Sequence, residues 1–167
     1  MPVSDQKISN HKYQVIPRVL IFVVDDPRVL LLRGDKNKKI WAGKYNGVGG
    51  HVEDGEDILS AAKRELQEET ALQNLAITLC GTIMIQAAHD FGILVFVFYA
   101  KYAGGEIKPS SEGDLEWVAF GDVDKLPVVE DLPAILAQLQ IWRQNGKLFY
   151  GKSHYSDDGK IIINFQH

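Results

Sequence analysis

Two segments near the start of the chain are almost continuously apolar. Residues 18–24 and 28–32 are rich in valine, leucine and isoleucine, and Asp25, Asp26 and Pro27 stand between them. Short apolar runs bounded by acidic residues and proline are typical of buried strands and the turns that join them. We therefore predict a hairpin of two strands.

The apolar positions then change to a helical period. Across residues 57–69 they recur every three or four residues, which is typical of a helix with one buried face. The residues predicted to form that face are Ile58, Leu59, Ala62 and Leu66. A second helix is predicted to begin near Asp131, because Pro133 suits a first helical turn, and to end near Gly146.

Further apolar runs predict strands in the second half of the chain. They are residues 77–86, 92–102 and 115–120, followed by a closing hairpin of residues 148–156 and 160–165. A polar loop at 35–39 leads through Trp41 to the glycine-rich segment 47–50. The pattern of strands and helices is of the α+β type, and because no linker divides the chain we expect a single domain spanning residues 1–167.

Composition narrows the possible functions. The net charge is −4 and basic runs are missing, which argues against long nucleic acids as partners. Residues 1–14 lack an apolar signal core and no run reaches membrane-spanning length, so we expect a cytoplasmic protein without a membrane partner. The single cysteine, Cys80, has no partner for an intramolecular disulfide and is expected in the core.

The candidate chemistry lies in the first predicted helix. Glu65, Glu68 and Glu69 are spaced so that their side chains share one helix face. Like charges at this spacing destabilise a helix by about 0.2–0.5 kcal/mol per pair, so a cation is expected against them. Hard divalent ions such as Mg²⁺ or Mn²⁺ prefer oxygen ligands and often share them with phosphates. The three residues alone leave a solvated, glutamate-rich helix face as the alternative.

The spacing around these glutamates resembles the signature of the Nudix hydrolases, G-x5-E-x7-R-E-U-x-E-E-x-G-U, in which U is a bulky aliphatic residue. The matching residues are Gly50, Glu56, Arg64, Glu65, Leu66, Glu68, Glu69 and Leu72. The chain departs from the signature at Ala71, where the family has glycine. Either Ala71 adopts a left-handed backbone at a cost of about 1–2 kcal/mol, or the helix ends in another way.

The resemblance implies a Nudix-type α/β/α sandwich with a mixed β-sheet. It also implies metal-dependent hydrolysis of a nucleoside diphosphate linked to a further group. The implied metal ligands are Glu65, Glu68, Glu69 and the backbone carbonyl of Gly49. Glu56 and Arg64 are expected to brace the preceding loop against the helix and to orient its carboxylates. Gly50 is expected to leave the backbone open to the phosphates of the substrate.

A carboxylate must also accept the proton of the attacking water. Glu65 is the first candidate, with Arg64, Glu68 and Glu56 completing the catalytic group. Members of the family often recruit a further acid from outside the signature, and Glu112 is the candidate for such an additional metal ligand. The alternative for Glu112 is an exposed loop residue.

Three segments outside the signature, residues 44–50, residues 112–117, and residues 126–127 with 130–133, resemble the MutT-like 8-oxo-dGTP diphosphatases. This branch implies cleavage of an oxidised purine nucleoside triphosphate to the monophosphate and pyrophosphate, with Asn46 and Asp131 reading the base. An ionised Asp131 would accept the N7 hydrogen that 8-oxoguanine has and guanine lacks. The alternatives are a turn residue for Asn46 and a helix N-cap for Asp131. Trp117 and Phe120 are expected either to stack on the base or to pack in the core.

Other functions remain open at this point. We expect a small-molecule nucleotide as the substrate. Nudix hydrolases of other branches act on ADP-ribose, a dinucleoside polyphosphate, coenzyme A or an RNA 5′ end. An isopentenyl diphosphate isomerase would need its own catalytic cysteine, and a nucleotide-sensing Nudix module typically loses glutamates that this chain keeps. The protein is expected to be a monomer or a homodimer, with residues 93–99 and the closing hairpin as candidate dimer surfaces.

Overall fold

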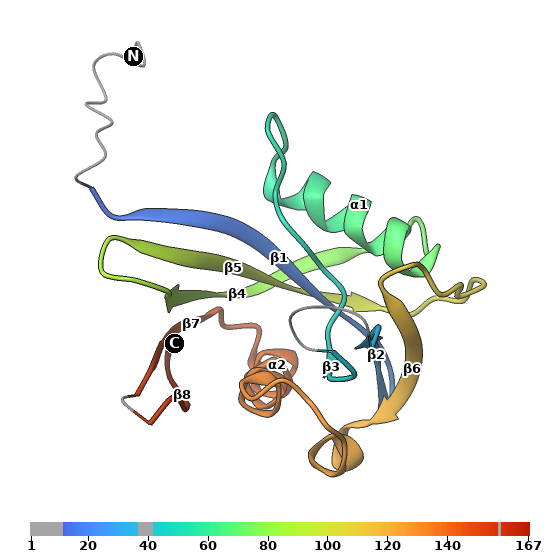
Figure 1. Cartoon of the computed structure of the whole chain (residues 1–167). Helices are drawn as coiled ribbons and strands as arrows, with labels where there is room; N and C mark the ends of the chain where they lie inside the picture. Colours follow the sequence, from blue (N-terminus) through green and yellow to red (C-terminus); the bar gives the residue numbers. More distant parts are fainter. Residues whose placement is uncertain (1–11, 37–41, 157) are drawn as a thin grey trace.

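A mixed β-sheet forms the centre of the fold (Figure 1). The computed structural model describes residues 12–36, 42–156 and 158–167, and within them the sheet has eight strands. The strands are β1 (Gln14–Asp25), β2 (Arg28–Gly34), β3 (Tyr45–Asn46), β4 (Ile77–Gln86), β5 (Phe91–Lys101), β6 (Gly113–Ala119), β7 (Phe149–Tyr155) and β8 (Ile161–Gln166). Residues 37–39 of the predicted polar loop and Trp41 lie outside the described residues.

The strand order is β3-β2-β1-β5-β4-β7-β8, with β6 paired to β2. β1 pairs with β5 and β4 pairs with β7 in parallel, and the remaining pairs of strands are antiparallel. Both edges of β5 are hydrogen-bonded, to β1 and to β4, so β5 offers no edge to a second chain. Of the two predicted dimer surfaces, only the closing hairpin lies at an edge of the sheet.

The predicted strands and the two hairpins are confirmed. β1 begins earlier than the apolar run indicated, because its parallel pairing with β5 already starts at Gln14 opposite Phe91. The two-residue strand β3 and the short 3-10 helix η2 (Phe120–Lys125) were not predicted from the sequence. Both contact residues that are distant in sequence: β3 pairs with β2, and Phe120 N–H at the start of η2 donates to the carbonyl of Pro27 at 3.1 Å.

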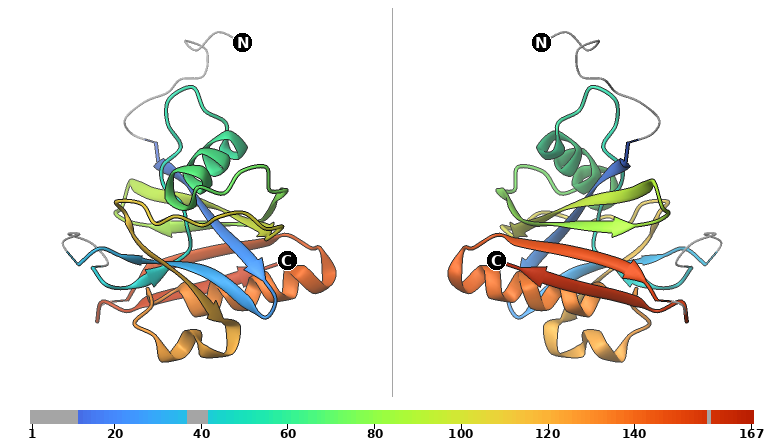
Figure 2. Two further views of the ribbon diagram at one scale, coloured as in Figure 1. Left: turned by 90° about the vertical axis from the view of Figure 1, so that its right-hand side faces the viewer. Right: turned by 90° about the vertical axis from the view of Figure 1, so that its left-hand side faces the viewer.

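Two helices cover opposite faces of the sheet (Figure 2). Helix α1 (Ile58–Thr70) packs through Ala62 and Leu66 on one face, in a cluster that includes Ile21 of β1. Helix α2 (Leu132–Asn145) packs through Ile135 and Leu139 on the other. This arrangement confirms the predicted α/β/α sandwich.

The prediction of which residues form the buried face of α1 is wrong at one position. Leu59 is 39% exposed, whereas Ala61, which was not predicted, is fully buried. In the first turn Ile58 is partly buried against the same cluster, whereas Leu59 faces solvent. Cys80 is fully buried, as predicted, and burial raises the pKa of its thiol to about 12.

Ala71 ends α1 in the left-handed conformation, with φ 63° and ψ 2°. Its backbone N–H donates to the carbonyl of Gln67, which closes the last helical turn. The first of the two alternatives for this departure from the signature is therefore confirmed, and Ala71 bears the conformational cost. No helix among the described residues is long and apolar enough to cross a membrane.

Candidate active site

The glycine-rich segment runs antiparallel to β1. Val19 N–H donates to the carbonyl of Gly50 at 2.9 Å, and Ile21 N–H donates to the carbonyl of Val48 at 2.7 Å. Gly49 has φ 153°, and a Cβ there would lie 2.1 Å from the carbonyl oxygen of Val19. The segment therefore fits against the strand only because Gly49 lacks a side chain.

The other side of this segment faces α1. A Cβ on Gly50 would lie 2.2 Å from Oε1 of Glu65, so the glycine leaves room for that carboxylate. Glu69 is 5% exposed, and its Oε2 accepts a hydrogen bond from Gly49 N–H at 2.9 Å. Glu65 and Glu69 thus hold adjacent residues of the loop, one by van der Waals contact and one by a hydrogen bond.

Arg64 connects the loop to the helix. Its Nε and Nη2 donate to the two oxygens of Glu56 at 2.8 and 3.0 Å, and Nη2 also donates to the carbonyl of His51 at 2.9 Å. Its Nη1 donates to Glu65 at 2.8 Å and to Glu68 at 3.2 Å. These bonds raise the pKa of Arg64, and the bond from Arg64 holds the pKa of Glu56 below its usual value. The predicted contact between Arg64 and Glu56 is present.

The three predicted metal ligands on α1 border the same loop with different exposures. The side chain of Glu68 is 60% exposed and that of Glu65 only 13%. Within the described residues, no three His, Cys, Asp or Glu side chains are grouped closely enough to hold a metal ion as they stand. Arg64 holds Glu65 and Glu68, and Gly49 holds Glu69. Carboxylate oxygens beside the backbone of Gly49 and Gly50 are nevertheless a donor set that fits a hard divalent ion.

Glu112 lies in the turn before β6 and is exposed. Its backbone carbonyl accepts from Asp35 N–H at 3.2 Å, at the end of β2. The loop that carries it is tied to the end of α1, because Lys108 N–H donates to the carbonyl of Thr70 at 3.0 Å. The structure therefore brings this loop to α1, while the metal-binding role of Glu112 stays a prediction.

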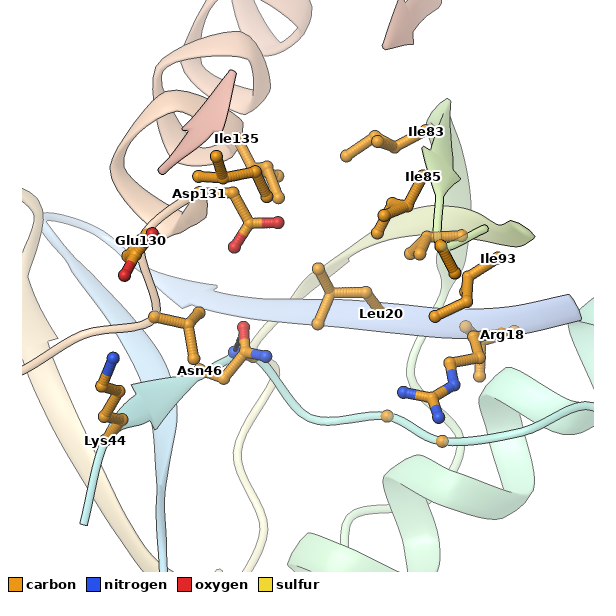
Figure 3. A pocket seen from close by; sticks show the side chains of 18 of the residues that line it. Arg18, Leu20, Lys44, Asn46, Ile83, Ile85, Ile93, Glu130, Asp131 and Ile135 are labelled. Atoms are coloured by element: carbon orange, nitrogen blue, oxygen red, sulfur yellow. Dashed lines mark hydrogen bonds between the residues drawn. The ribbon is translucent and has the colours of Figure 1, made fainter. Parts of the chain in front are cut away.

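A pocket of about 380 Å³ lies between the sheet and α2 (Figure 3). Gly49 and Gly50 form part of its wall, so the pocket reaches the loop that borders the glutamates of α1. The polar side chains that line it are Arg18, Lys44, Asn46, Glu130 and Asp131. Its apolar wall includes Leu20, Ile83, Ile85, Ile93, Val95, Ile135 and Ile161, and its single aromatic residue among those described is Tyr155.

The two predicted base-reading residues face one another in this pocket (Figure 3). Asp131 occupies the N-cap position of α2, as the alternative interpretation predicted, but its side chain makes no capping hydrogen bond. Burial raises the pKa of the Asp131 carboxyl group. The Oδ1 atom of Asn46 accepts a hydrogen bond from Gly47 N–H at 2.8 Å, which agrees with the alternative that Asn46 is a turn residue. The NH₂ group of its amide can still donate to a ligand.

Neither aromatic residue proposed for base stacking lines the pocket. Trp117 packs edge-on against Tyr102 at 5.1 Å and under Arg28, and Phe120 lies below Arg143. The core alternative holds for both. Sequence reasoning instead missed Arg18 and Tyr155, although a cation within an apolar run was a usable signal for Arg18.

Residues 15–139 match the sequence model of the NUDIX domain, over most of the chain. The chain belongs to the Nudix hydrolase family. Its site agrees with this assignment, since the signature residues Gly50, Glu56, Arg64 and Glu65 are joined in one contact network.

Three known proteins illustrate the range of similarity. The oxidized purine nucleoside triphosphate hydrolase of Danio rerio is 38% identical over 109 residues, which cover 65% of this chain and 67% of that protein. The NAD-capped RNA hydrolase NudC of Pseudomonas entomophila is 27% identical over 135 residues, 80% of this chain, but the match spans only 47% of NudC. The crystal structure of the MutT protein of Bacillus halodurans superposes with a TM-score of 0.76 at 28% identity, covering 91% of this chain and 98% of that one.

Proposed function

We propose that the protein hydrolyses a purine nucleoside triphosphate to the monophosphate and pyrophosphate, with an oxidised purine such as 8-oxo-dGTP as its preferred substrate. One observation carries this proposal: Asn46 and Asp131 line a pocket whose wall includes Gly49 and Gly50, next to the glutamates of α1. A base in the pocket would therefore place its phosphates beside those carboxylates. The similarity to the zebrafish hydrolase of oxidised purine nucleotides supports the same substrate class.

The base would be selected by two complementary groups. An ionised Asp131 accepts the N7 hydrogen of 8-oxoguanine, whereas guanine would present a lone pair to it and leave a buried carboxylate unpaired. The NH₂ group of Asn46 donates to an acceptor on the purine edge, because its oxygen is already engaged by Gly47. The aliphatic walls of the pocket exclude water from both hydrogen bonds.

The phosphates would be held with Mg²⁺ or Mn²⁺. The residues proposed to hold the metal are Glu65, Glu68, Glu69 and the carbonyl of Gly49, with Glu112 as a further ligand. A bound divalent ion supplies neutralisation of phosphate charge and a more acidic attacking water. Glu65 accepts the proton of that water, and Arg64 orients the carboxylates of Glu65 and Glu68 through Nη1.

A second candidate function is hydrolysis of a diphosphate that links two nucleosides. The similarity to NudC favours this candidate. A steady-state panel with Mg²⁺ separates the two candidates by comparing 8-oxo-dGTP, dGTP, ADP-ribose and a dinucleoside polyphosphate. Turnover of 8-oxo-dGTP with release of pyrophosphate, at a kcat/KM well above that for dGTP, supports the first. Activity confined to ADP-ribose or to the dinucleoside polyphosphate contradicts the first candidate.

A non-catalytic sensor is tested with Glu68→Gln. This substitution removes a carboxylate that is 60% exposed, so the fold should tolerate it. A hydrolase loses most of its turnover in this variant and keeps nucleotide binding. A wild-type protein that binds nucleotides without turning over any member of the panel would instead be a sensor.

A further inference from the structure

Arg18 differs from every other arginine of the chain. The other four each pair with a carboxylate: Arg28 with Asp25, Arg33 with Asp114, Arg64 with Glu56 and Arg143 with Asp26. Across the residues that the structure describes, no such pair includes Arg18, although its side chain is half-buried and lines the pocket. A partly desolvated guanidinium without a carboxylate is expected to have an anionic ligand.

His51 fixes one edge of this guanidinium. Nε of Arg18 donates to Nε2 of His51 at 3.2 Å, from the strand-like segment that pairs with β1. The bond orients the planar group and leaves Nη1 and Nη2 as the forked pair of donors. Such a fork matches two oxygens of a phosphate group better than the single point charge of a lysine does.

The position of Arg18 selects which phosphate it meets. Figure 3 shows Arg18 on one side of the pocket, and Asn46 and Asp131 on the other. The acidic side chains of Glu130 and Asp131 lie with the base-reading group, and Lys44 lies on the same side. The two carboxylates there outnumber the single ammonium group, so that side is the less favourable one for a phosphate. Arg18 shares the pocket wall with Gly49 and Gly50, behind which Glu65 lies.

We propose that Arg18, oriented by His51, binds the phosphate attached to the sugar of the nucleotide. The assignment rests on the proposed function, because it takes the base to lie against Asp131 and the outer phosphates to reach α1. The phosphate next to the sugar is then the group that passes Arg18. Arg18 acts as a binding residue that aligns the phosphate chain between the base pocket and the carboxylates.

The test is calorimetric binding without metal, so that it does not depend on turnover. The ligands are two pairs that differ only by one phosphate: 8-oxo-dGMP with 8-oxo-deoxyguanosine, and dGMP with deoxyguanosine. We expect wild-type protein to bind each monophosphate about tenfold or more tightly than its nucleoside. Arg18→Gln should reduce that ratio to near one while nucleoside affinity stays unchanged, and Arg18→Lys should retain part of it. Arg28→Gln, at an exposed arginine outside the pocket, is the matched control and should keep the full ratio.

A ratio that survives in Arg18→Gln overturns the proposal, as does a wild-type protein that shows no gain from the phosphate in either pair. Equal weakening of nucleoside and monophosphate by both Arg18 variants also overturns it, because that result indicates a structural role. Failure of the proposed function gives a different result. In that case 8-oxo-deoxyguanosine and deoxyguanosine bind equally, while the effect of the phosphate still depends on Arg18.

Discussion

The two sides of the Gly49–Gly50 segment have opposite chemistry. On the side of α1, Glu65 and Glu69 touch the glycines and Arg64 joins Glu65 to Glu56 in a network of charged hydrogen bonds. On the side of α2, the walls of the pocket are mainly aliphatic, and Arg18 lies apart from the group formed by Asn46 and Asp131 (Figure 3). The comparison separates reaction chemistry from base selection, because different elements of the fold supply each. Substitutions on the α1 side should then leave base selectivity unchanged, and substitutions on the α2 side should leave the reaction chemistry unchanged.

The largest expected effect is on the α1 side. Glu65→Gln removes the proposed proton acceptor and one proposed metal ligand while keeping nearly the same shape. We expect kcat with Mg²⁺ to fall by about 10²–10⁴-fold, with nucleotide affinity retained. Glu106→Gln is the matched control, since Glu106 is exposed on the loop after β5 and pairs only with Lys108 among the described contacts. Turnover within a few-fold of wild type in Glu65→Gln would contradict its role.

On the α2 side, Asp131→Asn should act on selectivity. The amide keeps an acceptor but loses the charge, so we expect the preference for 8-oxo-dGTP over dGTP in kcat/KM to fall by about 10–100-fold. Burial raises the pKa of Asp131, so its ionised form should be lost at a higher pH than for an ordinary aspartate. The wild-type preference is therefore expected to fall on acidification, and the preference of Asp131→Asn should not change over the same range.

The closing hairpin provides a smaller effect on the same side. Tyr150 and Tyr155 of β7 are both exposed, but only Tyr155 lines the pocket. Stacking of a base on an aromatic ring contributes roughly 1–3 kcal/mol, so Tyr155→Ala should raise KM for nucleotides by about tenfold and leave kcat nearly unchanged. Tyr150→Ala is the control at matched chemistry. Equal KM values for the two variants would show that Tyr155 does not contribute to nucleotide binding in the pocket.

The smallest effect should belong to neither side. Ala71 ends α1 with positive φ, a conformation that glycine adopts without the penalty of a Cβ. Ala71→Gly should therefore raise the free energy of unfolding by up to about 1 kcal/mol in urea titration, partly offset by the greater freedom of glycine in the unfolded chain. Activity on every substrate should be unaffected. A destabilised variant would show that Ala71 contributes packing that outweighs its strain.

The two sides also differ in how far the sequence predicts them. The α1 side is local: Gly50, Glu56, Arg64 and Glu65 lie within one short stretch, so the resemblance to the family signature was enough to predict that Glu56 and Arg64 brace the loop, and the two residues are in contact. The pocket is formed by residues of β1, β4, β5, α2 and the closing hairpin. The local sequence of a strand that is buried on both faces does not indicate which of its residues face α2. Arg18 and Tyr155 were missed because long-range pairing of β1 with β5, and of β7 with β4, brings them to the pocket.

Measuring kcat/KM for 8-oxo-dGTP and dGTP in wild type, Glu65→Gln and Asp131→Asn tests the separation of the two sides most directly. We expect Glu65→Gln to lower both values by the same factor and to keep their ratio. We expect Asp131→Asn to lower the ratio, mainly by slowing the reaction of 8-oxo-dGTP. A ratio that changes in Glu65→Gln, or two values that fall equally in Asp131→Asn, would contradict the division between chemistry at α1 and base selection at α2.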